Sequence, residues 1–474
     1  MSTVFTASAT ELAGHLRAGA ITSRDLVQAH LDHIARVNPA LNAFVAMRSA
    51  DAMREADAAD AALSAAKTPA AKRKLPPYLG VPCSIKETFA LEGFPQTGGM
   101  VSRKDHISAA DAPTVARLRA AGAIPLGITN TSELAMWMES FNKLYGRTNN
   151  PYDLGRTSGG SSGGEGAAVG SACVPFGLGS DIGGSIRMPA FFNGVFGHKP
   201  SAGLVTNDGQ YPVAENAALD YQCSGPIARR AEDLDPLLRI LAGPDASIED
   251  PQKVAIGDLT VHVVTGDGLW RVDRELLAAQ QRAADALQAA GARVVRTEIR
   301  QLKRAFEIWS AMLAAESTPF RTQLAEGGDF DVRGELAKFV RRTSEHTFPA
   351  LGLALIEMVP ERMPERSAKS IAAGLALREE MAQLLSGDTV LLYPPYPTLA
   401  PKHNHPLVPP LRFTYTAIWN VMHTPVTQVP LGLSRDRLPL GVQVVAAQGA
   451  DHRSLAVALH LESALGGWVP PWKV

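Results

Sequence analysis

A lysine in an apolar stretch is the first residue whose chemistry stands out. Lys86 follows the segment VPCSI at positions 81–85. An ammonium group buried among such side chains costs free energy unless it is paired or loses its charge. If Lys86 is buried, desolvation lowers its pKa from about 10.4 toward neutrality, and the neutral amine is a general base. An exposed strand-end lysine paired with Glu87 is the alternative.

A glycine- and serine-rich segment could supply hydroxyl groups. Thr157–Gly166 reads TSGGSSGGEG, includes Ser161 and Ser162, and leads into a helical pattern of small residues. Its N–H groups can therefore converge at a helix N-terminus, which favours negative charge. Taken alone, such a run is typical of a flexible linker. It lacks the Gly-Lys-Ser/Thr ending of a nucleotide phosphate loop, which disfavours that interpretation.

A second serine lies at a sharp turn. The segment GSDIGGSIR, Gly179–Arg187, follows an apolar strand pattern, and Gly183-Gly184 lets the chain bend just before Ser185. An ordinary strand-to-helix turn is the alternative. No Asp and His downstream have the distinctive setting of a Ser-His-Asp triad. A serine activated without histidine needs another base, and Lys86 can fill that role.

The elements that position these residues alternate between apolar strand segments and helical segments, which is typical of an α/β fold. Strands are expected within Tyr78–Lys86, Ala123–Thr129 and Cys173–Ser180, and helices over Pro113–Gly122, Ser132–Ser140 and Glu165–Ala172. In the second half, strands are expected at 261–264 and 293–299, with a helix between them that ends at Gly291. An antiparallel hairpin over 424–447 would make the sheet mixed.

The remaining segments are predominantly helical. A helix capped at Thr22 is predicted to end near Asn38-Pro39, a second covers Asp51–Ala66, and a basic connector, Lys67–Pro77, follows. Asp451–Leu465 is predicted to be the last helix. Residues from about 300 to 385 are predicted to be helical, including an apolar helix near Phe348–Val359. No segment reads as a linker between domains, so residues 1–474 are expected to form one domain: a helical segment at 1–77, a core at 78–230 and the insertion at about 300–385.

Composition excludes several classes of protein. With 46 Lys and Arg against 47 Asp and Glu, the formal charge of −1 provides no long-range attraction for nucleic acid or anionic lipid. Three widely spaced cysteines follow no metal-ligand spacing and suit a reducing compartment. No secretory signal or membrane-spanning helix is visible. We therefore expect a cytoplasmic enzyme without stable membrane insertion.

In their order and spacing, the lysine strand, the Ser-Gly loop and the GGS turn resemble the amidase signature family. The most diagnostic part spans about Gly80 to Pro200, and family-like features continue to GGWVPP near the end, except over about 300 to 385. The resemblance implies an α/β/α sandwich around a mixed, twisted central sheet. It also implies a serine hydrolase that needs no cofactor and no metal.

The resemblance assigns catalytic roles to three residues. Ser185 would be the nucleophile, Ser161 the bridging serine after a cis peptide bond, and Lys86 the terminal base. Proton transfer from Ser185 through Ser161 to Lys86 would activate the nucleophile.

The resemblance also assigns roles around this triad. An oxyanion hole would be formed by backbone N–H groups next to the nucleophile, those of Ile182, Gly183 and Gly184. The turn would be supported by Ser162, Asp181 and Arg187. The acyl side of the substrate pocket would be lined by Met136 and Trp137.

The expected reaction is hydrolysis of C–N bonds in hydrophobic amides or anilides, through an acyl-enzyme. Amidase-signature urethanases cleave carbamates, so carbamates are a further expected substrate class. GGSSGGEGAAVGS and RMPAFFNGVFGHKP resemble fatty-acid-amide-hydrolase-like and broad bacterial amidases. The alternative is the glutaminase component of a tRNA-dependent amidotransferase, which more often reads GLKPT where this chain has GHKPS at 197–201. As a small-molecule hydrolase, the protein is expected to be a monomer or homodimer.

Overall fold

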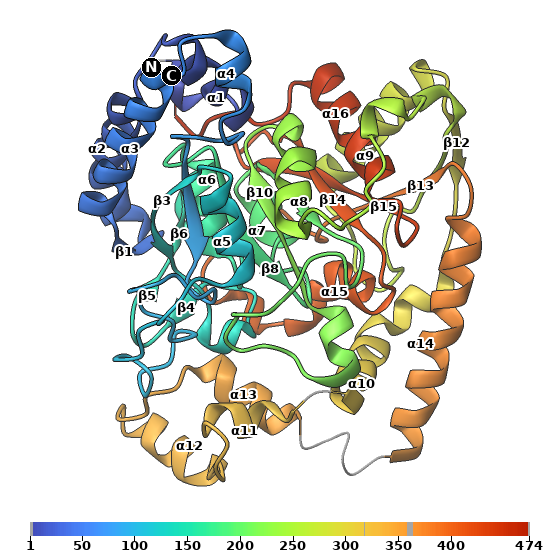
Figure 1. Ribbon diagram of the computed structural model, residues 1–474. Coiled ribbons are helices and arrows are strands. Elements are labelled where there is room, and N and C mark those ends of the chain that lie inside the picture. The colour runs from blue at the N-terminus through green and yellow to red at the C-terminus, as the bar shows by residue number, and fades with distance from the viewer. Residues whose placement is uncertain (1–2, 317, 358–363, 473–474) are drawn as a thin grey trace.

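The computed structural model describes residues 3–316, 318–357 and 364–472, and within them eleven strands form one mixed sheet (Figure 1). In spatial order the strands are β1 (Phe44–Met47), β3 (Ile124–Thr129), β2 (Pro82–Lys86), β8 (Phe176–Asp181), β10 (Cys223–Ala228), β9 (Phe196–Lys199), β14 (Val426–Leu433), β15 (Pro439–Ala446), β13 (Thr389–Tyr393), β11 (Thr260–Val263) and β12 (Arg293–Arg296). Strands from both halves of the chain thus share one sheet. The α/β prediction with a mixed sheet is confirmed.

Parallel strands in the first half of the sheet bring the chemistry together. β2 pairs in parallel with both β3 and β8, so the carboxyl ends of these strands lie at one edge. Every residue of β2 and β8 is buried, as expected of parallel strands covered on both faces. Lys86 and Asp181, the last residues of the two strands, therefore lie at the same edge.

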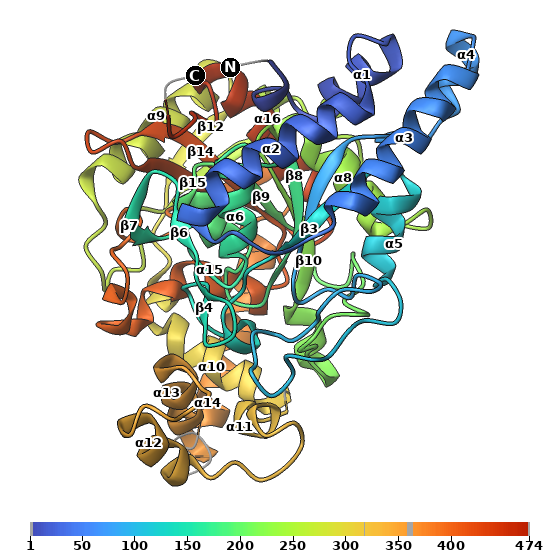
Figure 2. The same ribbon diagram turned by 90° about the vertical axis from the view of Figure 1, so that its left-hand side faces the viewer.

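Helices cover both faces of the sheet (Figures 1 and 2). Outside residues 305–384 they are α1 (Ala9–Ala18), α2 (Ser23–Leu41), α3 (Ser49–Ala65), α4 (Pro69–Arg73), α5 (Pro113–Ala120), α6 (Gly163–Gly170), α7 (Arg187–Phe192), α8 (Leu234–Ala242), α9 (Arg274–Ala289), α15 (Thr414–Val421) and α16 (Asp451–Leu465). As predicted, the Thr22 side chain caps α2, and Gly466 ends α16 in the left-handed conformation.

The N-terminal segment differs from its prediction in three details. Pro39 lies inside α2, which continues to Leu41 and ends at a left-handed Asn42. The connector at 67–77 contains the short helix α4, begun by the Thr68 cap. The segment also contributes a strand, because β1 pairs with β3 at the edge of the sheet.

The helix predicted over Ser132–Ser140 is wrong. Only Glu133–Ala135 form a short 3-10 turn, and Leu134 has a φ of 49°. The Leu134 N–H donates to the carbonyl of Gly98 at 2.7 Å, and the Glu133 carboxylate accepts the backbone N–H of Thr347 at 2.8 Å. Contacts with distant segments therefore override a helix-compatible sequence pattern.

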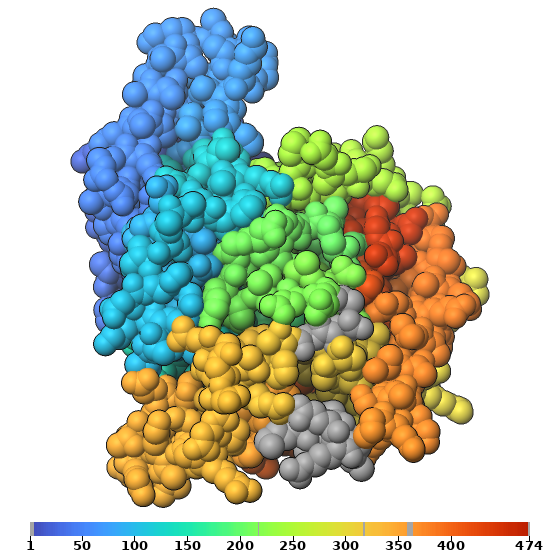
Figure 3. All heavy atoms as spheres, turned by 60° about the horizontal axis from the view of Figure 1, so that its bottom comes forward, coloured from blue at the N-terminus to red at the C-terminus, as the bar shows by residue number. Residues whose placement is uncertain are grey.

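The helical prediction for about 300–385 is confirmed for the residues described. The helices are α10 (Ala305–Glu316), α11 (Phe320–Leu324), α12 (Val332–Val340), α13 (Phe348–Ile356) and α14 (Pro364–Leu384). They gather at the lower end of the molecule in Figures 1 and 2, and Figure 3 looks onto that end. The apolar helix expected at Phe348–Val359 is α13, and its last two predicted positions lie outside the described residues. Among the described helices, none combines the length and apolar character required to cross a bilayer.

Candidate active site

Lys86 is fully buried at the end of β2 and contacts two hydroxyl groups. Its amine donates to Ser161 Oγ at 2.7 Å and to Ser180 Oγ at 2.9 Å. Burial lowers the pKa of Lys86 to about 7, although the nearby carboxylates of Asp181 and Glu165 oppose the shift. The interpretation of Lys86 as an exposed strand-end lysine is therefore wrong.

The Ser-Gly segment is a buried loop and not a flexible linker. Residues 157–166 are all buried and lead into α6. The peptide bond between Gly160 and Ser161 is cis. Gly160 has no room for a side chain, because a Cβ there would overlap the carbonyl oxygen of Trp137 and lie 2.7 Å from the Glu139 nitrogen. Close backbone contact thus fixes the position of Ser161.

Ser140 holds the same loop through two hydrogen bonds. Its hydroxyl donates to the Ser161 carbonyl and accepts the Gly163 N–H, both at 2.8 Å. Ser162 joins the loop to the second motif, since its N–H donates to the Ser185 carbonyl at 3.3 Å and its hydroxyl donates to the Ser180 carbonyl at 3.2 Å. The two serine motifs are therefore connected directly.

Asp181 holds the turn that follows β8. Its carboxylate accepts the N–H groups of Gly184 at 2.7 Å and Ile186 at 3.0 Å, and it forms an ion pair with Arg187 at 2.8 Å. Both side chains of the pair are fully buried. Burial alone would raise the pKa of Asp181, but Arg187 and the backbone donors hold it well below its usual value.

Arg187 extends this network to the C-terminal part of the chain. Its guanidinium donates to the carbonyl of Thr416 at 2.8 Å, to Gln443 Oε1 at 3.0 Å and to Asn420 Oδ1 at 2.7 Å. A buried guanidinium needs such partners, because each unsatisfied donor carries a desolvation cost. Asp181 and Arg187 are therefore buried partners and not surface charges.

Two close contacts shape the glycine turn itself. Gly184 has a φ of 112°, and a Cβ there would overlap the Thr416 side chain, so only glycine fits. On the other side, the Trp309 indole of α10 donates to the Ile182 carbonyl at 3.1 Å. A Cβ on Gly183 would lie 3.4 Å from the Trp309 ring. The turn is therefore held between α10 and α15.

Ser185, the predicted nucleophile, follows Gly184 in this turn, and its carbonyl accepts the Ser162 N–H at 3.3 Å. Ser185 is half-buried, and within the described part of the chain its hydroxyl has no hydrogen-bond partner. The N–H groups of Gly183 and Ser185 are also without acceptors there, whereas the Gly184 N–H is occupied by Asp181. The Gly184 N–H, which was expected to face the oxyanion, thus already has a partner within the protein.

Met136 and Trp137 are both half-buried beside the Ser161 loop. Trp137 lines a cavity of about 210 Å³ that none of Lys86, Ser161 and Ser185 lines. Met136 packs against the cluster of Met100 and Leu134.

Sequence reasoning missed several residues of this site. Ser180 and Glu165 lie inside the motifs and Ser140 lies outside them, but the type of none of the three marks its role. Glu165 accepts buried hydrogen bonds from Ser84 and Thr129. Trp309 and Thr416 come from segments without a readable motif. They reach the site only because α10 and α15 pack beside it.

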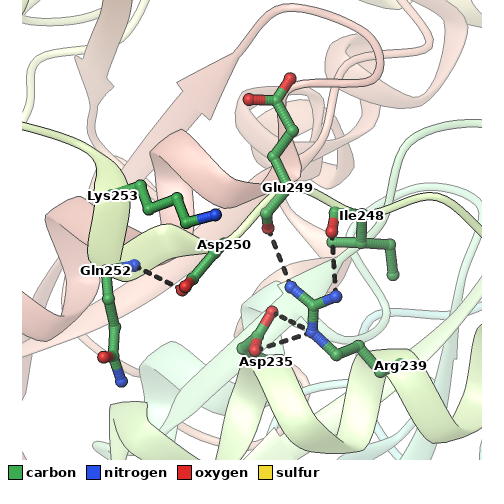
Figure 4. Close-up of a pocket in the computed structure, with 7 residues that line it drawn as sticks. All are labelled: Asp235, Arg239, Ile248, Glu249, Asp250, Gln252 and Lys253. Atoms are coloured by element: carbon green, nitrogen blue, oxygen red, sulfur yellow. Dashed lines mark hydrogen bonds and ion pairs between the residues drawn. The ribbon is translucent and has the colours of Figure 1, made fainter.

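The larger cavity, about 520 Å³, lies elsewhere and is lined by none of the predicted residues. It is an open, charged hollow beside α8 (Figure 4). Its Arg239 is occupied by Asp235 at 2.9 Å and by the carbonyls of Ile248 and Glu249. Because Arg239 is already paired within the protein, we do not assign the active site to this cavity. The candidate active site is the buried cluster of Lys86 and the serines.

Comparison with known proteins agrees with this geometry. The Amidase family profile matches residues 25–455. Fatty-acid amide hydrolase 2-B of Danio rerio is 48% identical over 485 residues, covering 99% of this chain and 91% of that protein. The A component of the glutamyl-tRNA(Gln) amidotransferase of Chromohalobacter salexigens is 32% identical over 483 residues, covering 96% of each. A solved structure described as an amidase superimposes with a TM-score of 0.79 at 26% identity, covering 97% of this chain and 100% of that one. The chain therefore belongs to the amidase signature family and is an amide hydrolase.

Proposed function

We propose that this amide hydrolase cleaves C–N bonds of hydrophobic amides, anilides and carbamates through a Ser185–Ser161–Lys86 triad. The observation that carries the proposal is the fully buried amine of Lys86, 2.7 Å from the Ser161 hydroxyl. Burial lowers the pKa of Lys86 to about 7, so the neutral amine is accessible near neutral pH. A neutral amine at this position is a base that needs no histidine.

The reaction then has two halves. Lys86 takes the proton of Ser161, which takes that of Ser185 as the Ser185 oxygen bonds to the carbonyl carbon. The proton returns through Ser161 to the leaving nitrogen as the C–N bond breaks, which leaves an acyl-enzyme and a free amine. Water then adds to the acyl carbon by the same relay and releases the acid and Ser185.

Backbone donors would stabilise the negative charge on the tetrahedral intermediate. We assign this role to the N–H groups of Ile182, Gly183 and Ser185. The Gly184 N–H instead donates to Asp181 and holds the turn in place. Losing one such donor costs about 3 kcal/mol in other serine hydrolases. Asp181, Arg187 and Ser162 are positioning residues, because they touch the turn and not the reacting atoms.

The helical segment would form the substrate entrance of a single domain spanning residues 1–474. Trp309 lies against Gly183, and its ring meets Phe413 edge-on with centroids 5.0 Å apart. Aromatic groups beside the reacting serine favour a hydrophobic acyl or leaving group. Met136, half-buried near the Ser161 loop, is proposed to contribute to the acyl side, whereas Trp137 lines the separate 210 Å³ cavity.

Carbamates fit the same mechanism, because attack on a carbamate carbonyl produces a similar tetrahedral oxyanion. The higher identity to a fatty-acid amide hydrolase, 48% against 32% for the amidotransferase component, supports a hydrolase that acts without a partner. The amidotransferase alternative instead requires glutaminase activity and a second chain.

Replacing the nucleophile tests this proposal. Ser185→Ala should reduce hydrolysis of an aryl amide and of the matching aryl carbamate by at least about a thousandfold, because no covalent intermediate can form. Exposed Ser102→Ala is the matched control and should retain full turnover. Circular dichroism and thermal unfolding should match the wild type for both variants. Undiminished turnover by folded Ser185→Ala would refute the mechanism.

A further inference from the structure

The 210 Å³ cavity that Trp137 helps to line lies between the β4–β5 hairpin and the helices α12 and α13. The hairpin strands are β4 (Phe141–Asn142) and β5 (Gly146–Arg147), which lie just above these helices in Figures 1 and 2. Its ten lining residues are Trp137, Glu139, Phe141, Lys143, Arg147, Phe339, Phe348, Pro349, Asn404 and Leu407. The lining residues thus come from three separate parts of the chain.

The cavity combines aromatic walls with cations. Phe339 and Phe348 lie with ring centroids 5.8 Å apart, and Lys143 lies 5.8 Å from the Phe339 centroid. Arg147 lies 4.8 Å from the Phe141 centroid. An engineered apolar cavity of about 150 Å³ binds benzene, so the 210 Å³ cavity can hold a slightly larger ligand. The occupant is therefore small and largely apolar.

The charges of the lining are unbalanced. Lys143 and Arg147 face a single carboxylate, that of Glu139, which accepts the Asn404 N–H at 3.0 Å and lies 3.7 Å from His403. In the described parts of the chain, neither cation has an ion-pair partner, and Arg147 donates only to Asn404 Oδ1, at 2.7 Å. The Trp137 indole nitrogen is also buried there without an acceptor. Lys143 is exposed and Arg147 half-buried, so both can pair with a ligand's oxygen acceptors, and such a ligand could also accept from the buried Trp137 N–H.

From these observations we propose that the cavity is a binding site for a small aryl carboxylate, separate from the catalytic centre. The ring packs among Phe141, Phe339 and Phe348, and the carboxylate pairs with Lys143 and Arg147. The site adjoins the catalytic loop, because Trp137 and Glu139 line the cavity while their backbones contact Gly160. Binding needs no turnover and is independent of the proposed triad.

Fluorine NMR titration with 4-fluorobenzoate tests the site, with 4-fluorobenzyl alcohol as the neutral analogue. We expect the carboxylate to bind more tightly than the alcohol to both the wild type and Ser185→Ala. Removing both cations in Lys143→Gln/Arg147→Gln should weaken the carboxylate about tenfold and leave the alcohol nearly unchanged, since partly exposed ion pairs contribute modestly. Exposed Lys104→Gln is the matched control and should bind like the wild type.

A filling substitution separates this cavity from the active site. Leu407→Trp should abolish binding of both probes, because the larger side chain occupies the cavity. If 4-fluorobenzoate binds the double variant or Leu407→Trp as it binds the wild type, the proposal is overturned. Equal affinity of the two probes would overturn the carboxylate assignment. A failed triad, shown by active Ser185→Ala, leaves these titrations unaffected.

Discussion

Ion pairs in the serine turn and in the helical segment α10–α14 are held in different ways. The Asp181–Arg187 pair is fully buried, and backbone donors and buried amide side chains satisfy its remaining atoms. In α10 and α14, the Glu307–Arg366 pair has side chains that are 40% and 64% exposed. A buried charge depends on its partner far more than an exposed one does. The buried pair therefore depends on each of its partners, whereas the exposed pair can change at little cost.

The largest effect expected from this contrast is on stability. Asp181→Asn leaves the Arg187 charge buried without its counter-ion and should lower the free energy of unfolding by about 3–5 kcal/mol. Glu307→Gln removes the exposed pair and should cost no more than about 1 kcal/mol. Urea denaturation followed by circular dichroism measures both. If both variants lose the same free energy of unfolding, the proposed difference between the buried and the exposed ion pair is wrong.

A smaller effect is expected where the two regions meet. Trp309→Phe keeps an aromatic ring on α10 but removes the hydrogen bond to the Ile182 carbonyl, which is worth about 1 kcal/mol. We expect kcat to fall about fivefold while KM for a hydrophobic aryl amide changes little, because the turn loses its position and the pocket keeps its ring.

Trp270→Phe, a partly buried tryptophan outside the turn, provides the control for this variant and should leave kcat unchanged. A rise in KM alone for Trp309→Phe would show that Trp309 binds substrate and does not position the turn.

The sequence predicts those parts of the site that depend on local chemistry. The sequence alone shows an apolar strand that ends in Lys86, and it shows the glycines that a tight turn requires. Ser180 could have been anticipated, because it precedes Asp181 on a strand parallel to that of Lys86. Trp309 could not, because its place beside Gly183 depends on how α10 packs.

The same limit explains the wrong helix at 132–140. Its pattern is compatible with a helix, but the Leu134 N–H bonds to Gly98 and Glu133 bonds to the segment at 346–347. These partners lie far away in the sequence, so no local pattern reports them. By contrast, the caps of α2 and α16 depend on neighbouring residues and were predicted correctly.

The central claim is that Lys86 acts as a neutral base, and the pH dependence of kcat/KM tests it most directly. Burial lowers the pKa of Lys86 to about 7, so protonation below that pH removes the base. We predict that kcat/KM for an aryl amide falls about tenfold per pH unit below pH 7 and is constant above it. A kcat/KM that stays constant from pH 8 down to pH 5.5 in the folded enzyme would contradict the account.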